Sequence, residues 1–292
     1  MKNKKSSSKF SNSKSFYKDV DKKSKREITH RPAVGGVPLQ KRHGQNFLRD
    51  TKVLMDIVLA ANLDKTSSVF EIGCGDGVLT RELLHQGIER LWVFEIDPAW
   101  AQQVAAGLND QRLVMHEGDF LEADLELLAS NAPWVLVANL PYHLTFSILH
   151  KIHANRHYIQ RGVIMIQEEV ALKITKNKGR GYGYVSLFFQ YYFDWQLLVK
   201  VPPESFYPAP KVFSRVLSFV TKPDVKPIIN EEKFWKFIKY CFAQPRRTLR
   251  NNLVQSSISL SLIPENLLEL RAQQLQMSDF LQLWDVIYNQ VT

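Results

Sequence analysis

Cysteine and long apolar runs are both scarce in this sequence. Its 292 residues include only two cysteines, Cys74 and Cys241, which lie far apart and fit no ligand spacing. A disulfide framework or a zinc finger is therefore not expected, and a reducing compartment fits. No apolar run approaches the roughly 20 residues of a membrane-spanning helix. Hydrophobic residues make up 45% and charged residues 23% of the chain, a composition typical of a packed soluble protein rather than a fibrous or wholly disordered one.

Acidic and apolar residues are few at the start of the chain. Residues 1–30 hold ten Lys and Arg against three acids, a net +7 of the formal +9. Such a segment cannot bury enough apolar surface to fold, so we predict a basic disordered tail over residues 1–38. It is either an arm that follows a phosphate backbone or a solubilising extension. The apolar core of a secretory signal and the Arg-rich, acid-poor composition of a transit peptide are both missing, which predicts a cytoplasmic protein.

From about residue 50, strand patterns alternate with helical ones. A helix is expected over 51–62, with Asp50 as its N-cap, and a second over 78–85, ended by Gly87. Pro98 opens a third helix. Strands separated by helices predict parallel βαβ units, hence an α/β fold with an open, Rossmann-like sheet. The expected strands are 68–72, 91–96, 112–116, 134–138 and 162–167.

The pattern changes after about residue 197. Segments 199–201 and 215–220, joined by a Pro-rich stretch, predict an antiparallel hairpin at the sheet edge, and the Pro-containing run 222–227 indicates a linker. The rest has helical spacing that favours three or four helices. The predicted domains are the tail, a catalytic domain over 39–222 and a small all-helical domain over 231–292.

A glycine loop follows the first expected strand, with Gly73, Gly75 and Gly77 in the run Glu71 to Gly77. Glycines allow a ligand to approach the backbone, and the next helix presents its N-terminus. The third glycine comes one position early for a dinucleotide fingerprint, which argues against NAD. Glu95 ends the second strand and Asp119 follows the third, suited to ribose hydroxyls and an adenine amine, respectively. Together these residues predict an adenosine-containing cofactor rather than a plain tight turn.

The run Asn139-Leu140-Pro141-Tyr142 at the end of the fourth strand is the sharpest signal. The Asn139 side-chain oxygen and the Leu140 carbonyl can accept both hydrogens of an adenine amine, which favours a pyramidal nitrogen with a directed lone pair. Pro141 fixes φ and has no N–H, and Tyr142 offers a face for an extruded base. The alternative is an ordinary turn.

These motifs resemble those of the S-adenosylmethionine-dependent rRNA adenine dimethyltransferases, the KsgA family, over about residues 40–290. Two further stretches carry the resemblance, Gln45-Asn46-Phe47-Leu48 and Pro202-Pro203-Glu204-Ser205-Phe206. The resemblance implies S-adenosyl-L-methionine as cofactor and dimethylation of two adjacent adenosines near the 3′ end of small-subunit (16S) rRNA. It also implies an immature small ribosomal subunit as partner, a role in ribosome biogenesis and a monomer. The related Erm enzymes act on large-subunit rRNA, and the Asn139–Tyr142 loop and the basic run 244–253 favour KsgA.

The resemblance also implies roles for single residues. The methyl-transfer loop would be Asn139, Leu140, Pro141 and Tyr142, with Phe206 as a second stacking face. The implied cofactor contacts are Asn46, Leu48, Gly73, Glu95, Asp119 and Asn139. No general base is required, because attack on a sulfonium methyl leaves an acidic amine that loses its proton to solvent; orientation and electrostatics would supply catalysis.

Three arginines of the helical segment, Arg246, Arg247 and Arg250, could bind rRNA phosphates or form a solvated helix face. Pro245 departs from the family pattern, which has a basic or polar residue ahead of the Arg pair. Basic residues 173–180 surround a glycine-rich loop that either borders the substrate entrance or is an ordinary surface loop. The histidines at 150, 153 and 157 lack a neighbouring carboxylate or Cys, so no metal site is predicted.

Three functions stay open at this point. The first is the small-subunit dimethyltransferase, and the second is an Erm-like enzyme of large-subunit rRNA. The third is an assembly or transcription factor that keeps the fold without needing catalysis, against which the intact Asn139, Pro141 and Tyr142 argue.

Overall fold

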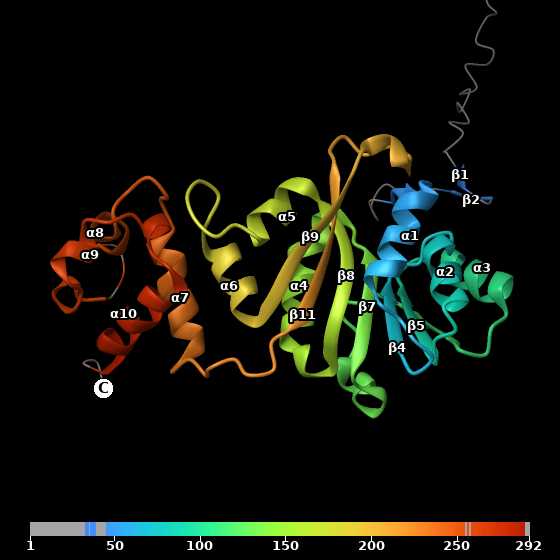
Figure 1. Ribbon diagram of the computed structural model, residues 1–292, viewed down its shortest axis with the longest axis horizontal. Coiled ribbons are helices and arrows are strands. Elements are labelled where there is room, and N and C mark those ends of the chain that lie inside the picture. Colours follow the sequence, from blue (N-terminus) through green and yellow to red (C-terminus); the bar gives the residue numbers. More distant parts are fainter. Residues whose placement is uncertain (1–32, 35, 39–44, 255, 257, 290–292) are drawn as a thin grey trace, which may run out of the picture. The chain divides into compact units, whose positions relative to one another are not determined.

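The structure is a computed structural model that describes residues 33–34, 36–38, 45–254, 256 and 258–289. Its main sheet is mixed and has seven strands (Figure 1). Five neighbouring strands are parallel, and β11 then runs antiparallel to both β8 and the edge strand β9. The structure thus confirms the open α/β sheet with an antiparallel pair at its edge. Across the sheet the strands are β6 (Leu113–Glu117), β5 (Arg90–Glu95), β4 (Ser68–Ile72), β7 (Trp134–Asn139), β8 (Ile159–Gln167), β11 (Ser214–Thr221) and β9 (Phe193–Val201).

Helices cover both faces of this sheet. One face packs against α1 (Thr51–Ala60), α2 (Val78–His85) and α3 (Pro98–Leu108). The other face packs against the 3-10 helix η2 (Leu125–Asn131), α4 (Thr145–Ala154), α5 (Glu168–Ile174) and α6 (Tyr184–Tyr192), with the short η4 (Arg156–Tyr158) between α4 and β8.

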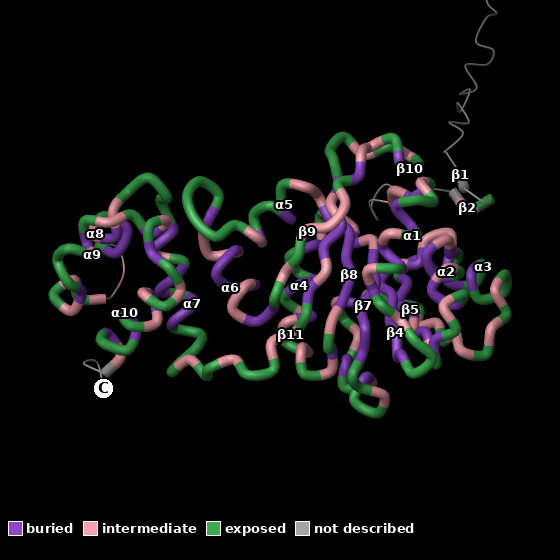
Figure 2. Tube along the Cα trace, viewed as in Figure 1, coloured by how far each residue is buried: buried purple, intermediate pink, exposed green. Residues whose placement is uncertain are grey.

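The central strands are buried along most of their length (Figure 2). In β4, Val69 belongs to the core under α1 and α2, whereas Phe70 and Ile72 belong to the core on the opposite face. Side chains alternate along a strand, so Glu71 points to the same face as Val69. A strand buried on both faces has no solvated side for a carboxylate, and the Glu71 side chain lies entirely inside the protein.

Local signals set the helix ends, as predicted. The Asp50 carboxylate accepts hydrogen bonds from the backbone of Lys52 and Val53 at the start of α1, at 3.0 and 3.2 Å. Gly87 has a φ of +69° just beyond α2. Pro98 occupies the first turn of α3.

The remaining helices follow β11 and pack against α6. Trp235 donates its indole N–H to the Tyr192 hydroxyl at 3.0 Å, and that hydroxyl donates to Glu231 at 2.5 Å. One hydrophobic core therefore extends from α4 and α6 into this helical part, and the predicted boundary between 222 and 231 stays a prediction. The helical elements are α7 (Glu231–Cys241), α8 (Leu249–Leu253), η6 (Leu260–Leu262), α9 (Glu265–Leu268), η7 (Ala272–Gln274) and α10 (Met277–Asn289).

Two small antiparallel sheets complete the described chain. One pairs β1 (Ala33–Val34) with β2 (Val37–Pro38). The other pairs β3 (Phe47–Leu48) with β10 (Phe206–Tyr207), which follows the 3-10 turn η5 (Pro203–Ser205). The predicted basic tail, residues 1–38, lies outside the described residues except at its end. Within the described ranges no helix is long and apolar enough to span a bilayer.

Candidate functional site

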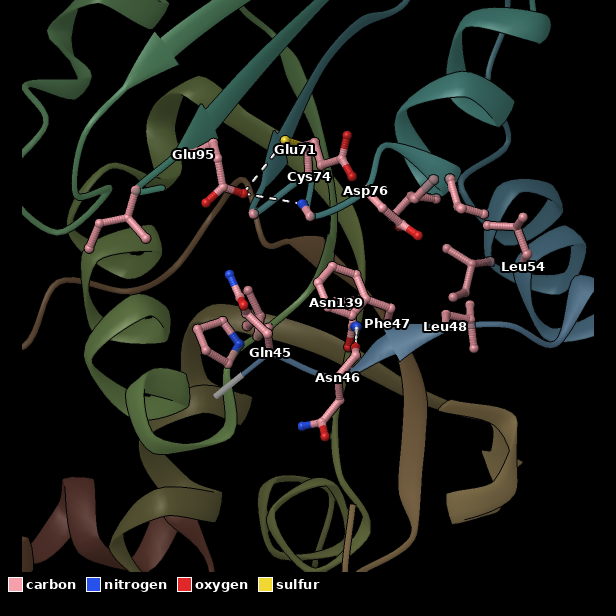
Figure 3. A pocket seen from close by; sticks show the side chains of 18 of the residues that line it. Gln45, Asn46, Phe47, Leu48, Leu54, Glu71, Cys74, Asp76, Glu95 and Asn139 are labelled. Atoms are coloured by element: carbon pink, nitrogen blue, oxygen red, sulfur yellow. Dashed lines mark hydrogen bonds between the residues drawn. The ribbon is translucent and has the colours of Figure 1, made fainter. Parts of the chain in front are cut away.

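A cleft opens at the carboxyl ends of β4, β5 and β7 (Figure 3). In an open α/β sheet, this is the edge where ligands bind. The cleft brings together eight of the predicted site residues, which come from three strand ends and from the segment before α1. Its lining consists of Gln45, Asn46, Phe47, Leu48, Leu54, Ile57, Glu71, Gly73, Cys74, Gly75, Asp76, Val78, Leu79, Glu95, Ile96, Asn139, Leu140, Pro141 and Tyr142.

The glycine loop after β4 needs its glycines for two different reasons. Gly75 has a φ of +52°, and a Cβ there would lie 2.9 Å from the Phe47 ring. Gly73 has a φ of +76° but faces open space, so its backbone is accessible from the cleft side. The loop thus combines left-handed turns with a close approach between Gly75 and the β3 segment.

The Glu95 carboxylate is held in place by backbone donors at the end of β5. Its Oε2 accepts from the Gly75 N–H at 3.1 Å, and its Oε1 accepts from the Asp97 N–H at 2.9 Å. The Cys74 thiol lies 3.5 Å from the same Oε2, and burial raises the pKa of that thiol. Glu95 is 4% exposed. A carboxylate has about four acceptor sites, so Glu95 can accept further hydroxyl donors from a ligand.

Glu71 is a second acid at the cleft, in a very different environment. Thr80 donates its hydroxyl to Glu71 Oε2 at 2.7 Å, while Oε1 has no hydrogen-bond partner among the described residues. Burial, above all, and the nearby carboxylates of Glu95 and Asp76 raise the pKa of Glu71 to about 8. Sequence analysis singled out Glu71 only as the start of the glycine loop. The sequence signal that could have identified it is a lone acid within an otherwise apolar strand.

The Asn139 side chain is oriented by the segment before α1. Its amide nitrogen donates to the backbone carbonyl of Asn46 at 3.1 Å. With the nitrogen committed as a donor, the amide oxygen is the group that can accept from a ligand. Next along the chain, the Leu140 N–H donates to the Met165 carbonyl at 3.0 Å, which fixes the loop to β8.

Tyr142 opens a 3-10 turn, η3 (Tyr142–Leu144), that leads into α4. Its hydroxyl lies 2.5 Å from the hydroxyl of Ser214, the first residue of β11. Burial raises the pKa of Tyr142, against the opposite effect of the Ser214 hydrogen bond. The phenol is therefore neutral at physiological pH, with its hydroxyl directed to the sheet and its half-buried ring beside the cleft.

Pairing of β3 with β10 ties the Asn46 segment to the Pro-rich stretch. The Arg49 N–H donates to the Ser205 carbonyl at 2.8 Å, and the Arg49 guanidinium pairs with Asp76 of the glycine loop. Phe206, 4% exposed, lies opposite Leu48 and belongs to the core. Sequence analysis did not predict this pairing, nor the places of Gln45, Phe47 and Asp76 in the cleft.

Two of the predicted catalytic and cofactor-binding residues lie outside the cleft lining. Phe206 is one, and it belongs to the same core cluster as Leu48. Asp119 is the other: it lines a separate surface hollow with Phe94 and Gly118, one strand further along the sheet. The Gly118 N–H donates to the Glu95 carbonyl at 2.8 Å, so the loop that bears Asp119 adjoins the end of β5.

The three predicted RNA-binding arginines differ in their surroundings. Arg246 lines a second, wide hollow between the loop before α6 and the helical part. Arg247 is exposed. Arg250 donates hydrogen bonds to Glu265 and Glu269, so its charge is already compensated. The wide hollow is lined by five cations and by no acid; its lining is Lys173, Arg180, Gly181, Tyr182, Gly183, Tyr184, Val185, Lys239, Phe242, Pro245, Arg246, Arg271 and Gln273.

A family model and curated relatives both match this chain over most of its length. A family model described as Ribosomal RNA adenine dimethylase matches residues 37–287. The Ribosomal RNA small subunit methyltransferase A of Syntrophotalea carbinolica is 37% identical over 271 residues, which cover 89% of this chain and 98% of that protein. The protein of the same name from Chlorobium phaeobacteroides is 35% identical over 253 residues, or 86% of this chain and 92% of that protein.

Solved structures show the same fold. A dimethyladenosine transferase from Plasmodium falciparum has a TM-score of 0.71 at 22% identity and covers 81% of this chain and 95% of its own. The 23S rRNA methyltransferase ErmE has a TM-score of 0.64 at 23% identity, with 83% of this chain and all of its own covered.

Proposed function

The chain belongs to the ribosomal RNA adenine dimethylase family, and we propose that it dimethylates the exocyclic amines of two adjacent adenosines near the 3′ end of small-subunit rRNA. The family match confirms the resemblance that the motifs predicted. The observation that carries the proposal within the cleft is the orientation of Asn139, whose amide nitrogen is committed to Asn46 and whose oxygen is left to accept from a substrate amine.

The residues of the cleft fit S-adenosyl-L-methionine. When bound, that cofactor supplies a methyl group made electrophilic by a sulfonium sulfur. Glu95, fixed by two backbone N–H groups, would accept from its ribose hydroxyls, and the open side of Gly73 leaves room beside the loop. Asn46, Leu48 and Asn139 would complete the contacts, with Asp119 accepting from the adenine amine at the neighbouring strand end.

The methyl-transfer loop acts by orientation. The Asn139 side-chain oxygen and the Leu140 carbonyl accept the two hydrogens of the target amine, which favours a pyramidal nitrogen and directs its lone pair. Pro141 holds the loop with a φ of −63° and offers no competing donor. The proton of the methylated amine leaves to solvent, because an alkylated adenine nitrogen is acidic. Preorganised acceptors therefore supply catalysis without a general base.

The target base stacks on Tyr142, whose ring is half-buried beside the cleft and whose hydroxyl is anchored to Ser214. Phe206 is the second stacking residue in this proposal. Because Phe206 is only 4% exposed, stacking on it requires that the β3–β10 pair shift when RNA binds.

The rRNA lies across the wide basic hollow. Arg246 lines it together with Lys173, Arg180, Lys239 and Arg271, and cations at this density suit a phosphate backbone. Arg247 is exposed and contributes at the rim. Arg250, paired with two glutamates, contributes less than sequence analysis predicted. Lys173, in the last turn of α5, and Arg180 flank the glycine-rich loop that sequence analysis interpreted either as the border of a substrate entrance or as a plain surface loop. The basic hollow favours the substrate entrance.

The wider setting follows from this substrate. We infer a cytoplasmic monomer that acts on the immature small ribosomal subunit, independently of membranes. Residues 39–222 would hold the cofactor and the methyl-transfer loop, and residues 231–292 would bind rRNA with the hollow that they share with the loop before α6.

Methylation of purified ribosomal subunits tests this function. The full chain is incubated with S-adenosyl-L-methionine and small subunits that lack adenine methylation, with large subunits in parallel, and nucleosides are identified by mass spectrometry. Dimethyladenosine only in the small-subunit sample is the expected result. Product only in large-subunit rRNA would favour the Erm-like function, and no product despite cofactor binding would favour a non-catalytic assembly factor.

A further inference from the structure

Phe213 is an exposed aromatic residue next to the methyl-transfer loop. It immediately precedes Ser214, whose hydroxyl lies 2.5 Å from the Tyr142 hydroxyl. Phe213 is nevertheless 45% exposed, and its neighbour Val212 is 43% exposed. Phe213 lies just before β11, which begins at Ser214.

The backbone of Phe213 is fixed even though its ring is exposed. Its carbonyl accepts from the Glu168 N–H at 3.0 Å, at the point where β8 passes into α5. Ser214 then pairs with Gln167 of β8 and Val201 of β9. The backbone of Phe213 is thus held by a hydrogen bond next to the first residue of β11, which gives the rigidity that a binding residue requires.

A lysine covers the Phe213 ring. The Lys200 ammonium lies 4.3 Å from the ring centroid, and this side chain is 48% exposed. The nearby Glu168 carboxylate does not fully neutralise the charge of Lys200, because the same carboxylate accepts two hydrogen bonds from Arg215, at 2.6 and 2.7 Å. Lys211, two residues before Phe213, is exposed as well. The surface therefore offers an aromatic face with a surplus of positive charge.

We propose that Phe213 and Lys200 bind the nucleotide adjacent to the target adenosine, with its base stacked on Phe213 and its phosphate paired with Lys200. This inference rests on the proposed function. Extruding a base from its stack leaves its neighbour without a stacking partner, and aromatic rings flanked by cations bind such single-stranded bases irrespective of sequence. Phe213 directly precedes Ser214, whose hydroxyl contacts that of Tyr142, so it lies near the residue on which the target base is proposed to stack.

Steady-state methylation of small subunits that lack adenine methylation tests this role. Four full-length variants are compared with wild type: Phe213→Ala, Phe213→Trp, Lys200→Gln and Val220→Ala. Val220 is 50% exposed at the other end of β11 and serves as a matched exposed apolar control. Dissociation constants for S-adenosyl-L-methionine are measured alongside.

We expect Phe213→Ala to raise the KM for small subunits roughly ten-fold or more, with cofactor affinity unchanged. Phe213→Trp keeps an aromatic face and should have a KM close to that of wild type. Lys200→Gln should raise the KM and lower the salt dependence of the KM. Val220→Ala should leave the KM unchanged. Three results would overturn the inference while wild type remains active. These are an unchanged KM in Phe213→Ala, a KM in Phe213→Trp as high as in Phe213→Ala, and a loss of cofactor affinity in Phe213→Ala equal to the rise in its KM. Lack of methylation by wild type would instead refute the proposed function, and this inference with it.

Discussion

The side-chain nitrogen of Asn139 donates a hydrogen bond to the backbone carbonyl of Asn46, 3.1 Å away and 93 residues earlier in the chain. This contact joins the end of β7 to the segment before α1, so one hydrogen bond positions both the proposed methyl-transfer loop and a proposed cofactor contact. Movement of the Asn46 segment therefore changes the orientation of the Asn139 amide. In the proposed function, this bond would couple cofactor binding to the orientation of the target amine.

Glu71 should make the stability of the protein depend on pH. Its pKa is raised from 4.5 to about 8 in the folded chain, so the folded state binds more protons than the unfolded state between these values. The contribution of Glu71 to the free energy of unfolding is complete below about pH 4.5. It is lost as the pH rises towards 8, by about 1.4 kcal/mol for each pH unit. Urea unfolding of wild type and Glu71→Gln at pH 5 and pH 8 measures it. A pH dependence that is the same in both proteins would contradict this assignment.

Gly75→Ala should impair cofactor binding through a steric clash. The new Cβ would lie 2.9 Å from the Phe47 ring at a φ of +52°. Gly87→Ala is the matched control, because Gly87 has a φ of +69° and nothing within 4 Å. Both variants should lose about 1–2 kcal/mol of stability from backbone strain, but only Gly75→Ala should also bind S-adenosylhomocysteine about ten-fold more weakly in calorimetric titration. Equal affinities in the two variants would argue against the clash.

Two substitutions at Tyr142 separate its ring from its hydroxyl. Tyr142→Phe keeps the stacking face and loses the bond to Ser214, so methylation of small subunits should fall by about five-fold, the worth of one hydrogen bond. Tyr142→Ala should lose far more, because the target base has no face on which to stack. Full subunit maturation supported by Tyr142→Ala would mean that catalysis is not the main role.

Arg246 and Arg250 should differ in their effect on rRNA binding. Removing Arg246 from the basic hollow should weaken binding and reduce the slope of log affinity against log salt by about one. Arg250, already bound to Glu265 and Glu269, should leave that slope nearly unchanged when replaced by Ala. Filter binding of small-subunit rRNA at several salt concentrations checks this. Equal slopes for the two variants would refute the assignment of the hollow to phosphate binding.

Most of the fold was predictable because its signals are local. The expected helix 78–85 and strand 68–72 have these same bounds in the structure, since apolar periodicity and the flanking glycines mark both. The strand β9 begins at Phe193, earlier than the expected strand at 199, because the aromatic run before it is shared between α6 and β9. Within β9, apolar Phe193, Trp195 and Leu197 alternate with polar residues, a strand pattern that the expected segment 199–201 did not include.

The site was predictable in its motifs but not in its tertiary contacts. Pairing of Leu48 with Phe206 involves strands of two residues, which are too short for any periodic pattern, and it buries a residue that sequence analysis expected at the surface of the site. Similarly, the partners of Arg250 come from α9 and the residue that follows it, a non-local pairing that helical spacing does not indicate.

The most direct test of the account is the dimethyladenosine yield of Asn139→Asp on small subunits, measured with its affinity for S-adenosyl-L-methionine. Asp has the shape of Asn but cannot donate to the Asn46 carbonyl, so two oxygens would face each other and the acceptor geometry would be lost. We predict that methylation falls by about two to three orders of magnitude, as for other preorganised catalytic groups, in a protein that still unfolds cooperatively. Methylation at the wild-type rate would contradict the proposed role of the Asn139 amide in orienting the target amine.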